Sequence, residues 1–358
     1  MKEGVRCARG FTLVEVLVGS AISLAVIAVA CLLAAEAQLA WRAASARVDL
    51  QQRARVTADL ISRLLREAGA GPMSGPARAN LIRGIPPVLP RRVGRRGAHP
   101  FNEFRTNAFT VIRAIAESEH GVLLTPVAPG TATLELSPGP CALTACGFAD
   151  GVSLMLLDSS GRFDIFTVTA VEGMAVSVRH HGVDRAAAYA AGTPVVAVES
   201  ASITLDASSR TLRLYDGDTT DLPLLDDVVD LKAVYFGEGE PPVWSRPPDG
   251  EANCLYAADG TYQSGLLPFL AAPGGLIELT SDMLTDGPWC GVGDTQYDAD
   301  LLRVRRMRVS VRLQAGDAAV RGTDRARFAN PGSARRSALF VPDVTVEIDV
   351  APRNLRLE

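Results

Sequence analysis

Lysine and histidine are scarce in this 358-residue chain, which contains only Lys2, Lys232 and 4 histidines. Signatures of common catalytic sites are missing too, since neither Gly-x-Ser-x-Gly nor His-Glu-x-x-His occurs. The 36 basic and 40 acidic side chains leave a formal net charge of −4, whereas nucleic-acid-binding domains carry clustered positive charge. We therefore expect no enzymatic activity, no catalytic or cofactor-binding residues and no nucleic-acid partner.

Charge is also missing from a long stretch near the N-terminus. Residues Val16 to Ala35 are twenty consecutive uncharged positions. A helix of this length spans about 30 Å, the thickness of a bilayer core. A short leader with Lys2, Arg6 and Arg9 precedes it and should stay cytoplasmic. Because no second run of this length exists, we expect one membrane-spanning helix over about residues 14–36.

Two other interpretations explain this run less well. A secretory signal peptide could be cleaved at residues 28–30 or 35–37, but the run is longer than the usual apolar core of about 7 to 15 residues. A generic membrane anchor leaves Glu15 unexplained, because a carboxylate at the edge of a hydrocarbon segment is costly unless it is paired. Cleavage between Gly10 and Phe11 would place a new α-amino group four residues before Glu15, on the same helical face.

The stretch from Arg9 to Leu17, Arg-Gly-Phe-Thr-Leu-Val-Glu-Val-Leu, resembles the type III signal of type IV prepilins and type II secretion pseudopilins. The resemblance implies that prepilin peptidase cleaves between Gly10 and Phe11 and methylates the new amino group of Phe11. It also implies that Glu15 guides assembly into a filament. Residues 1–10 are then a cytoplasmic leader peptide.

Helical periodicity continues beyond the apolar run. Val56, Leu60 and Leu64 recur every four residues, and the sequence from Gly69 to Pro72 then combines a glycine terminator with a proline. We therefore expect a pilin-type N-terminal helix within residues 11–69.

A connector rich in glycine, proline and arginine follows over residues 70–106. This connector could bind DNA or an acidic partner through four arginines, Arg91, Arg92, Arg95 and Arg96. No aromatic residue is interleaved among them for base stacking. The sequence favours a mobile, solvated surface segment.

From residue 107 onward, short apolar segments alternate with turn residues. Periodicity of two is clearest from Met307 to Leu313 and from Val344 to Val350, which is typical of half-buried strands. We expect an α+β protein, in which the long helix packs on a β-rich antiparallel head over residues 107–358. Residues 237–300 are expected to form a loop-rich insert in this periplasmic head.

Four cysteines remain in the head once Cys7 is assigned to the leader and Cys31 to the span. They are Cys141, Cys146, Cys254 and Cys290. An oxidising periplasm favours two disulfides, and of the three pairings we favour the first cysteine with the second and the third with the fourth. A zinc site is the alternative, although the spacing lacks a Cys-x2-Cys pair.

Two groups of aspartates offer oxygen ligands for calcium. They are Asp216, Asp218 and Asp221, and Asp294, Asp298 and Asp300. Neither group has the closing glutamate of an EF-hand loop, and aspartates that form turns are the alternative. We therefore predict no metal site.

Patches of the head resemble the PilW-like minor pilins, namely Val228–Tyr235, Val304–Val311 and Arg353–Leu357. The resemblance implies a minor pilin that primes type IV pilus assembly or lies at the pilus tip. Its partners would be prepilin peptidase, other minor pilins and the major pilin. It would be a single-pass inner-membrane protein and would reach the cell surface in the pilus. Two alternatives are a GspJ-like pseudopilin of type II secretion and a tip adhesin or DNA-uptake subunit.

Overall fold

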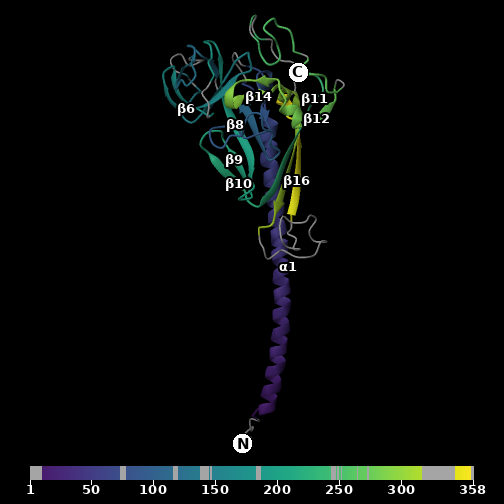
Figure 1. Ribbon diagram of the computed structural model, residues 1–358. Helices are drawn as coiled ribbons and strands as arrows, with labels where there is room; N and C mark the ends of the chain where they lie inside the picture. Colours follow the sequence, from purple (N-terminus) through teal and green to yellow (C-terminus); the bar gives the residue numbers. More distant parts are fainter. Residues whose placement is uncertain are drawn as a thin grey trace, which may run out of the picture. The chain divides into compact units, whose positions relative to one another are not determined.

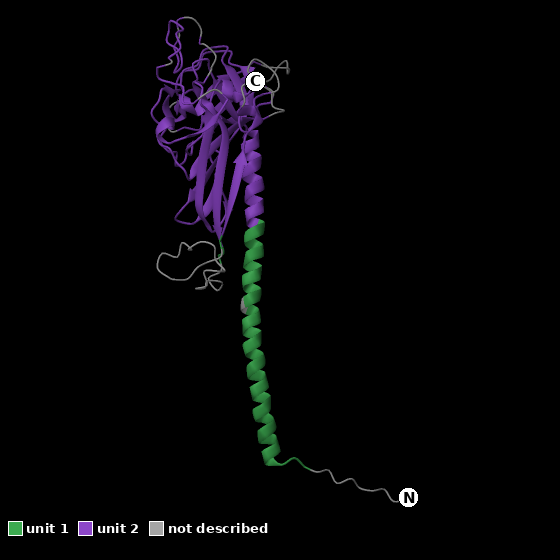
Figure 2. Cartoon of the chain, turned by 90° about the vertical axis from the view of Figure 1, so that its right-hand side faces the viewer, with its two compact units in different colours: residues 1–52, 315–343 green, residues 53–314, 344–358 purple. Residues whose placement is uncertain are grey.

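The structure is a computed structural model that describes residues 10–72, 78–115, 120–137, 145, 147–182, 187–242, 247, 250, 252–263, 265–271, 274–316 and 343–355. The chain divides into two compact units, residues 1–52 with 315–343 and residues 53–314 with 344–358 (Figure 2). Cys141 and Cys146, predicted to pair, lie outside the described residues.

A single α-helix, α1 (Leu13–Glu67), begins the described fold (Figure 1). Its 55 residues contain no proline that would interrupt the hydrogen-bond ladder. The helix ends before Gly69, whose φ of +74° is accessible to glycine at little cost. A Cβ atom at this position would also lie 2.9 Å from Leu355 Cδ2, so the chain turns where the backbone passes close to a neighbouring side chain.

The larger sheet of the head has ten strands, and β8 (Pro194–Asp206) joins its two halves. The first part of β8 pairs with β3 (His120–Val122) and β5 (Ser153–Leu157). The second part pairs with β2 (Ala108–Ala114) and β9 (Thr211–Tyr215). The other strands of this sheet are β1 (Val88–Leu89), β4 (Thr133–Glu135), β6 (Phe163–Glu172), β7 (Ala175–His180) and β10 (Asp221–Leu225).

A second sheet has four strands in the order β12 (Leu276–Leu279), β11 (Val228–Glu238), β15 (Val304–Gln314) and β16 (Asp343–Val350). Every second side chain of β15 from Met307 to Leu313 is fully buried, as the alternation predicted. The short strands β13 (Trp289–Cys290) and β14 (Tyr297–Asp298) form a third sheet. The 3-10 helices are η1 (Leu81–Arg83), η2 (Asp282–Leu284), η3 (Gly293–Thr295), η4 (Ala299–Arg303) and η6 (Arg353–Leu355).

A long N-terminal helix followed by an antiparallel β-rich head confirms the predicted α+β class. Strands of the larger sheet contribute side chains to a buried apolar cluster, which includes Leu154, Phe166 and Val195. The regions expected to be loops contain more order than predicted. Strand β1 in the connector pairs with β2, and β12 in the insert pairs with β11.

Candidate functional site

Two side chains close the first turn of α1 by exchanging hydrogen bonds with the backbone. Thr12 precedes the helix, and its Oγ1 accepts a hydrogen bond from the Glu15 N–H at 3.3 Å. The Glu15 carboxylate accepts one from the Thr12 N–H at 2.9 Å and another from the Thr12 hydroxyl at 3.0 Å. This arrangement is a capping box, which satisfies backbone N–H groups that a helix start leaves without partners. The Thr-x-x-Glu spacing was visible in the sequence, but sequence reasoning missed this role of Glu15.

The Gly10–Phe11 peptide bond lies directly before this turn, in an exposed segment without helical structure. Phe11 is 86% exposed. A Cβ atom added at Gly10 would have no heavy atom within 4 Å apart from its chain neighbours. The fold therefore places no steric demand on residue 10, and the predicted cleavage point is accessible.

The first part of α1 exposes a continuous set of apolar side chains. Leu17, Leu24 and Ile27 are 60%, 67% and 57% exposed. The helix is long and apolar enough to cross a membrane, and its most apolar window has no buried residue. Large exposed apolar surfaces require lipid or another protein surface. This segment can therefore anchor the chain in a membrane or pack among other helices.

The prokaryotic N-terminal methylation motif, a known family, matches residues 5–30. The N-terminus is of the prepilin type. The motif indicates a type IV pilin or pseudopilin, a structural class of subunits that prepilin peptidase processes and that assemble with other pilins. The capping box and most of the exposed apolar part of α1 fall inside the matched segment, whereas the rest of α1 and the head lie outside it. No curated protein matches the chain.

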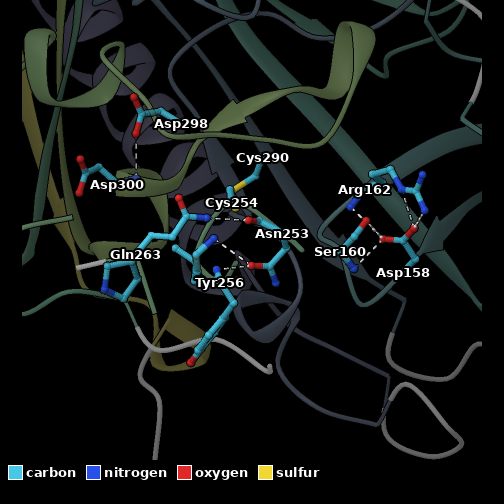
Figure 3. The surroundings of a disulfide bond; sticks show 12 residues. Asp158, Ser160, Arg162, Asn253, Cys254, Tyr256, Gln263, Cys290, Asp298 and Asp300 are labelled. Atoms are coloured by element: carbon cyan, nitrogen blue, oxygen red, sulfur yellow. Dashed lines mark hydrogen bonds and ion pairs between the residues drawn. A yellow bond between two sulfur atoms is a disulfide. The ribbon is translucent and has the colours of Figure 1, made fainter. Parts of the chain in front are cut away.

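In the head, a disulfide joins Cys254 to Cys290 (Figure 3). Their Cα atoms are 5.0 Å apart, and 36 positions separate them in the sequence. This is the pairing favoured from the sequence, and it closes a loop within the loop-rich insert, because both cysteines lie between residues 237 and 300. Beside it, the Asn253 Oδ1 accepts hydrogen bonds from the Leu255 and Tyr256 N–H groups at 2.9 and 2.8 Å, which holds the insert in a turn.

The insert is also held by a buried arginine. Arg303 is fully buried, and its guanidinium forms an ion pair with Asp300. The same guanidinium donates to the backbone carbonyls of Gly239, Glu240 and Pro268 at 3.2, 2.7 and 2.9 Å. One charged side chain therefore donates to the carbonyls of three loop residues, and the Gly239 carbonyl also accepts from the Leu270 N–H at 2.8 Å.

The expectation of a solvated basic loop is wrong for its first two arginines. Arg91 is 1% exposed, and its guanidinium donates to the backbone carbonyls of three residues: Phe101, Asp294 and Gln296. Burial lowers the pKa of Arg91 to about 10. Arg92 forms a 2.9 Å ion pair with Asp221 and lies over the Tyr215 ring. Only Arg95 and Arg96 of this cluster expose their side chains, so it does not offer four free guanidinium groups to DNA.

The first predicted aspartate cluster does not form a set of converging ligands. Asp218 pairs with Arg179, whereas Asp221 pairs with Arg92 and Arg213. Asp216 instead accepts hydrogen bonds from backbone N–H groups of its own turn. Ion pairing and turn formation account for these carboxylates.

The second cluster gathers differently from its prediction. Carboxylate oxygens of Asp298 and Asp300 lie within 4.8 Å of Asp286, which sequence reasoning missed, and Asp294 is not in this group. Asp298 accepts hydrogen bonds from the Gly287 and Asp300 N–H groups at 2.6 and 2.9 Å. Burial raises the pKa of Asp298 to about 7. Asp300 pairs with Arg303, so Asp298 serves as a backbone cap and Asp300 as an ion-pair partner in this cluster.

A buried polar trio resembles a catalytic triad but has a different bonding order. The Thr167 hydroxyl lies 2.8 Å from His181 Nε2 and donates to Asp218 Oδ2 at 2.8 Å. Since the single hydroxyl proton goes to the aspartate, His181 is the donor to threonine and does not act as its base. In a triad the acid instead contacts the second nitrogen of the histidine. Burial lowers the pKa of His181 to about 4, which favours a neutral structural role.

Proposed function

We propose that this protein is a minor pilin of a type IV pilus, of the PilW-like kind. The observation that carries the proposal is the methylation motif at residues 5–30, which leads directly into an exposed apolar helix. The patches from Val228 to Tyr235 and from Arg353 to Leu357 support the PilW-like placement. In this role the protein primes pilus assembly or lies at the pilus tip, and it performs no chemistry of its own.

Three residues carry the proposed processing and assembly steps. Prepilin peptidase cleaves between Gly10 and Phe11, and Phe11 receives the methyl group. Glu15 then forms an ion pair with a mature N-terminal amine in the filament, because a carboxylate among apolar helices needs a partner of opposite charge. The exposed position of the cleavage point supports the first step.

The proposed location is the inner membrane, crossed once by the first part of α1, with the head in the periplasm. Major and minor pilins are the proposed partners. The Cys254–Cys290 disulfide suits an oxidising compartment, and we propose a second disulfide between Cys141 and Cys146.

A type II secretion pseudopilin is the alternative that shares the same N-terminus. Deleting the gene distinguishes the two. If the protein is a minor pilin, the deletion is expected to reduce the number of surface pili while export of secreted enzymes continues. Normal piliation with reduced export would identify a pseudopilin. A role in DNA uptake has less support, because Arg91 and Arg92 are engaged inside the head.

Replacing Glu15 with leucine tests the assembly role. We expect processing to remain intact, because the change does not touch the Gly10–Phe11 bond, while pili fall in number. The measurement combines intact mass of the membrane-bound protein with a count of surface pili. Glu36→Leu is the matched control, since it removes another carboxylate of the same helix. Normal piliation by Glu15→Leu would contradict the role.

A further inference from the structure

A cavity of about 470 Å³ lies beside the Cys254–Cys290 disulfide, and pilus assembly through α1 does not use it. Three segments line it: the turn between β5 and β6, residues 252–254 of the insert, and residues 289–292. Figure 3 shows this turn on one side and the disulfide on the other. Because the disulfide links the second segment to the third, two walls of the cavity are covalently held together.

Among the described residues that line the cavity, Arg162 is the one with a formal charge. Its Nε donates to Asp158 Oδ2 at 2.7 Å, which fixes the direction of the guanidinium. The Asp158 side chain is only 14% exposed and also accepts hydrogen bonds from the Ser160 N–H and hydroxyl at 2.9 and 2.7 Å. A guanidinium has five N–H donors, so Arg162 keeps donors beyond those that Asp158 receives.

Asn253 lies in the opposite wall. Its Oδ1 already accepts two backbone hydrogen bonds, so the orientation of its amide is set. Its Nδ2 is buried and has no acceptor among the described residues. Because Nδ2 has almost no surface open to solvent, the donors that face the cavity are those of Arg162. The charge and the remaining donors of Arg162 favour a ligand group that only accepts hydrogen bonds, such as a carboxylate.

Trp289 and Val292 provide an apolar part of the same cavity. The Trp289 ring packs edge-on against Phe101, with ring centroids 5.2 Å apart, which holds the indole in place. A fixed aromatic ring beside planar polar groups suits a ligand with a ring face and a polar rim. We propose that this cavity binds a carboxylate-bearing sugar, with the carboxylate at Arg162 and the sugar ring against Trp289.

Titration of the full-length protein in detergent with D-glucuronate and D-glucose tests this assignment, because the two sugars differ in the carboxylate. Calorimetry is expected to show at least about tenfold tighter binding of glucuronate, since charge-assisted hydrogen bonds are the strong ones. Arg162→Met is expected to remove this preference. Arg95→Met, which deletes an exposed arginine that does not line the cavity, should leave it unchanged.

Asn253→Asp gives an independent variant. Aspartate keeps an oxygen for the two backbone N–H groups, so the turn should persist, but its negative charge opposes the ligand carboxylate. We expect about tenfold weaker glucuronate binding. Circular dichroism and a free-thiol count check the fold and the disulfide of each variant.

Several results would overturn the proposal. The first is equal affinity for both sugars, and the second is no heat of binding with glucuronate at about 10 mM. The third is an equal loss of glucuronate affinity in Arg162→Met and Arg95→Met. Tighter binding of a short peptide through its free C-terminal carboxylate would reassign the cavity to a protein terminus. None of these results depends on whether the chain assembles into pili.

Discussion

The first part of α1 and the insert of the head differ in where their side chains find contacts. The helix leaves Leu17 and Leu24 more than half exposed among the described residues, and an apolar surface of this kind favours contact with lipid or another protein. The insert instead buries Arg303 completely and gives its guanidinium partners from the same chain. The difference indicates that this part of the insert supplies its own partners, whereas the N-terminal helix is built for surroundings that the described residues do not provide.

The largest expected effect concerns a residue on which the fold places no demand. Gly10→Leu should abolish cleavage while leaving the structure unchanged, because an added side chain at residue 10 meets no neighbouring atom. The measurement is the intact mass of the protein from cells that contain prepilin peptidase. Gly19→Ala, at another glycine with open space, is the control and should be processed normally. Cleavage of Gly10→Leu at the same bond would refute the assigned site.

Removing the buried guanidinium tests the self-contained half of the comparison. Arg303→Met should destabilise the head by about 3–5 kcal/mol, because it leaves the Asp300 charge without its partner. Arg308→Met is the control, since this arginine is 45% exposed and pairs with Asp349 at the surface, where the loss should stay below about 1 kcal/mol. Urea unfolding followed by tryptophan fluorescence measures both. Equal losses of unfolding free energy in the two variants would mean that the burial of Arg303 does not strengthen its contribution to stability.

Acidification should weaken the head through His181. Its folded pKa of about 4 lies below the unfolded value near 6.5, so the folded state binds fewer protons. This contribution is complete above the unfolded pKa and is lost as pH falls towards 4, with about 2 kcal/mol gone by pH 5. His181→Gln should flatten that part of the pH dependence in thermal unfolding. An unchanged profile in the variant would show that His181 does not cause the acid destabilisation. Asp298 cannot replace it, because its raised pKa makes acidification stabilise the folded state.

The smallest effect is expected at the start of α1. Thr12→Ala removes the hydroxyl that accepts from the Glu15 N–H, which should cost the first turn about 1 kcal/mol. Hydrogen exchange of the Glu15 amide should therefore be about fivefold faster. Thr12→Ser keeps an acceptor and should exchange at the native rate. If Thr12→Ala also exchanged at that rate, the capping box would not stabilise the helix start.

Sequence reasoning was most successful where the information is local. The run from Val16 to Ala35 and the terminator at Gly69 predict a helix that the structure places over Leu13–Glu67. Strands with clear alternation, such as β15, were also predictable, because one face is buried along most of their length. Strands β1, β13 and β14 were missed, since two residues are too few to display a period.

The remaining differences arise from contacts between distant segments. Arg91 looks like any surface arginine in the sequence, and its burial depends on carbonyls of Asp294 and Gln296, about two hundred positions away. Asp286 joins Asp298 only because the chain folds back on itself. The cavity beside the disulfide likewise needs three segments that have no common sequence pattern.

The hydrogen bonds between Thr12 and Glu15 also bear on the order of events during filament growth. A subunit that diffuses alone in a membrane already gives Glu15 partners within its own first turn. In the proposed assembly step, an incoming amine displaces the Thr12 contacts, so incorporation exchanges one set of Glu15 partners for another. On this proposal a lone subunit gains little electrostatic energy from random association, and growth is favoured where a neighbour presents the amine at the depth of Glu15.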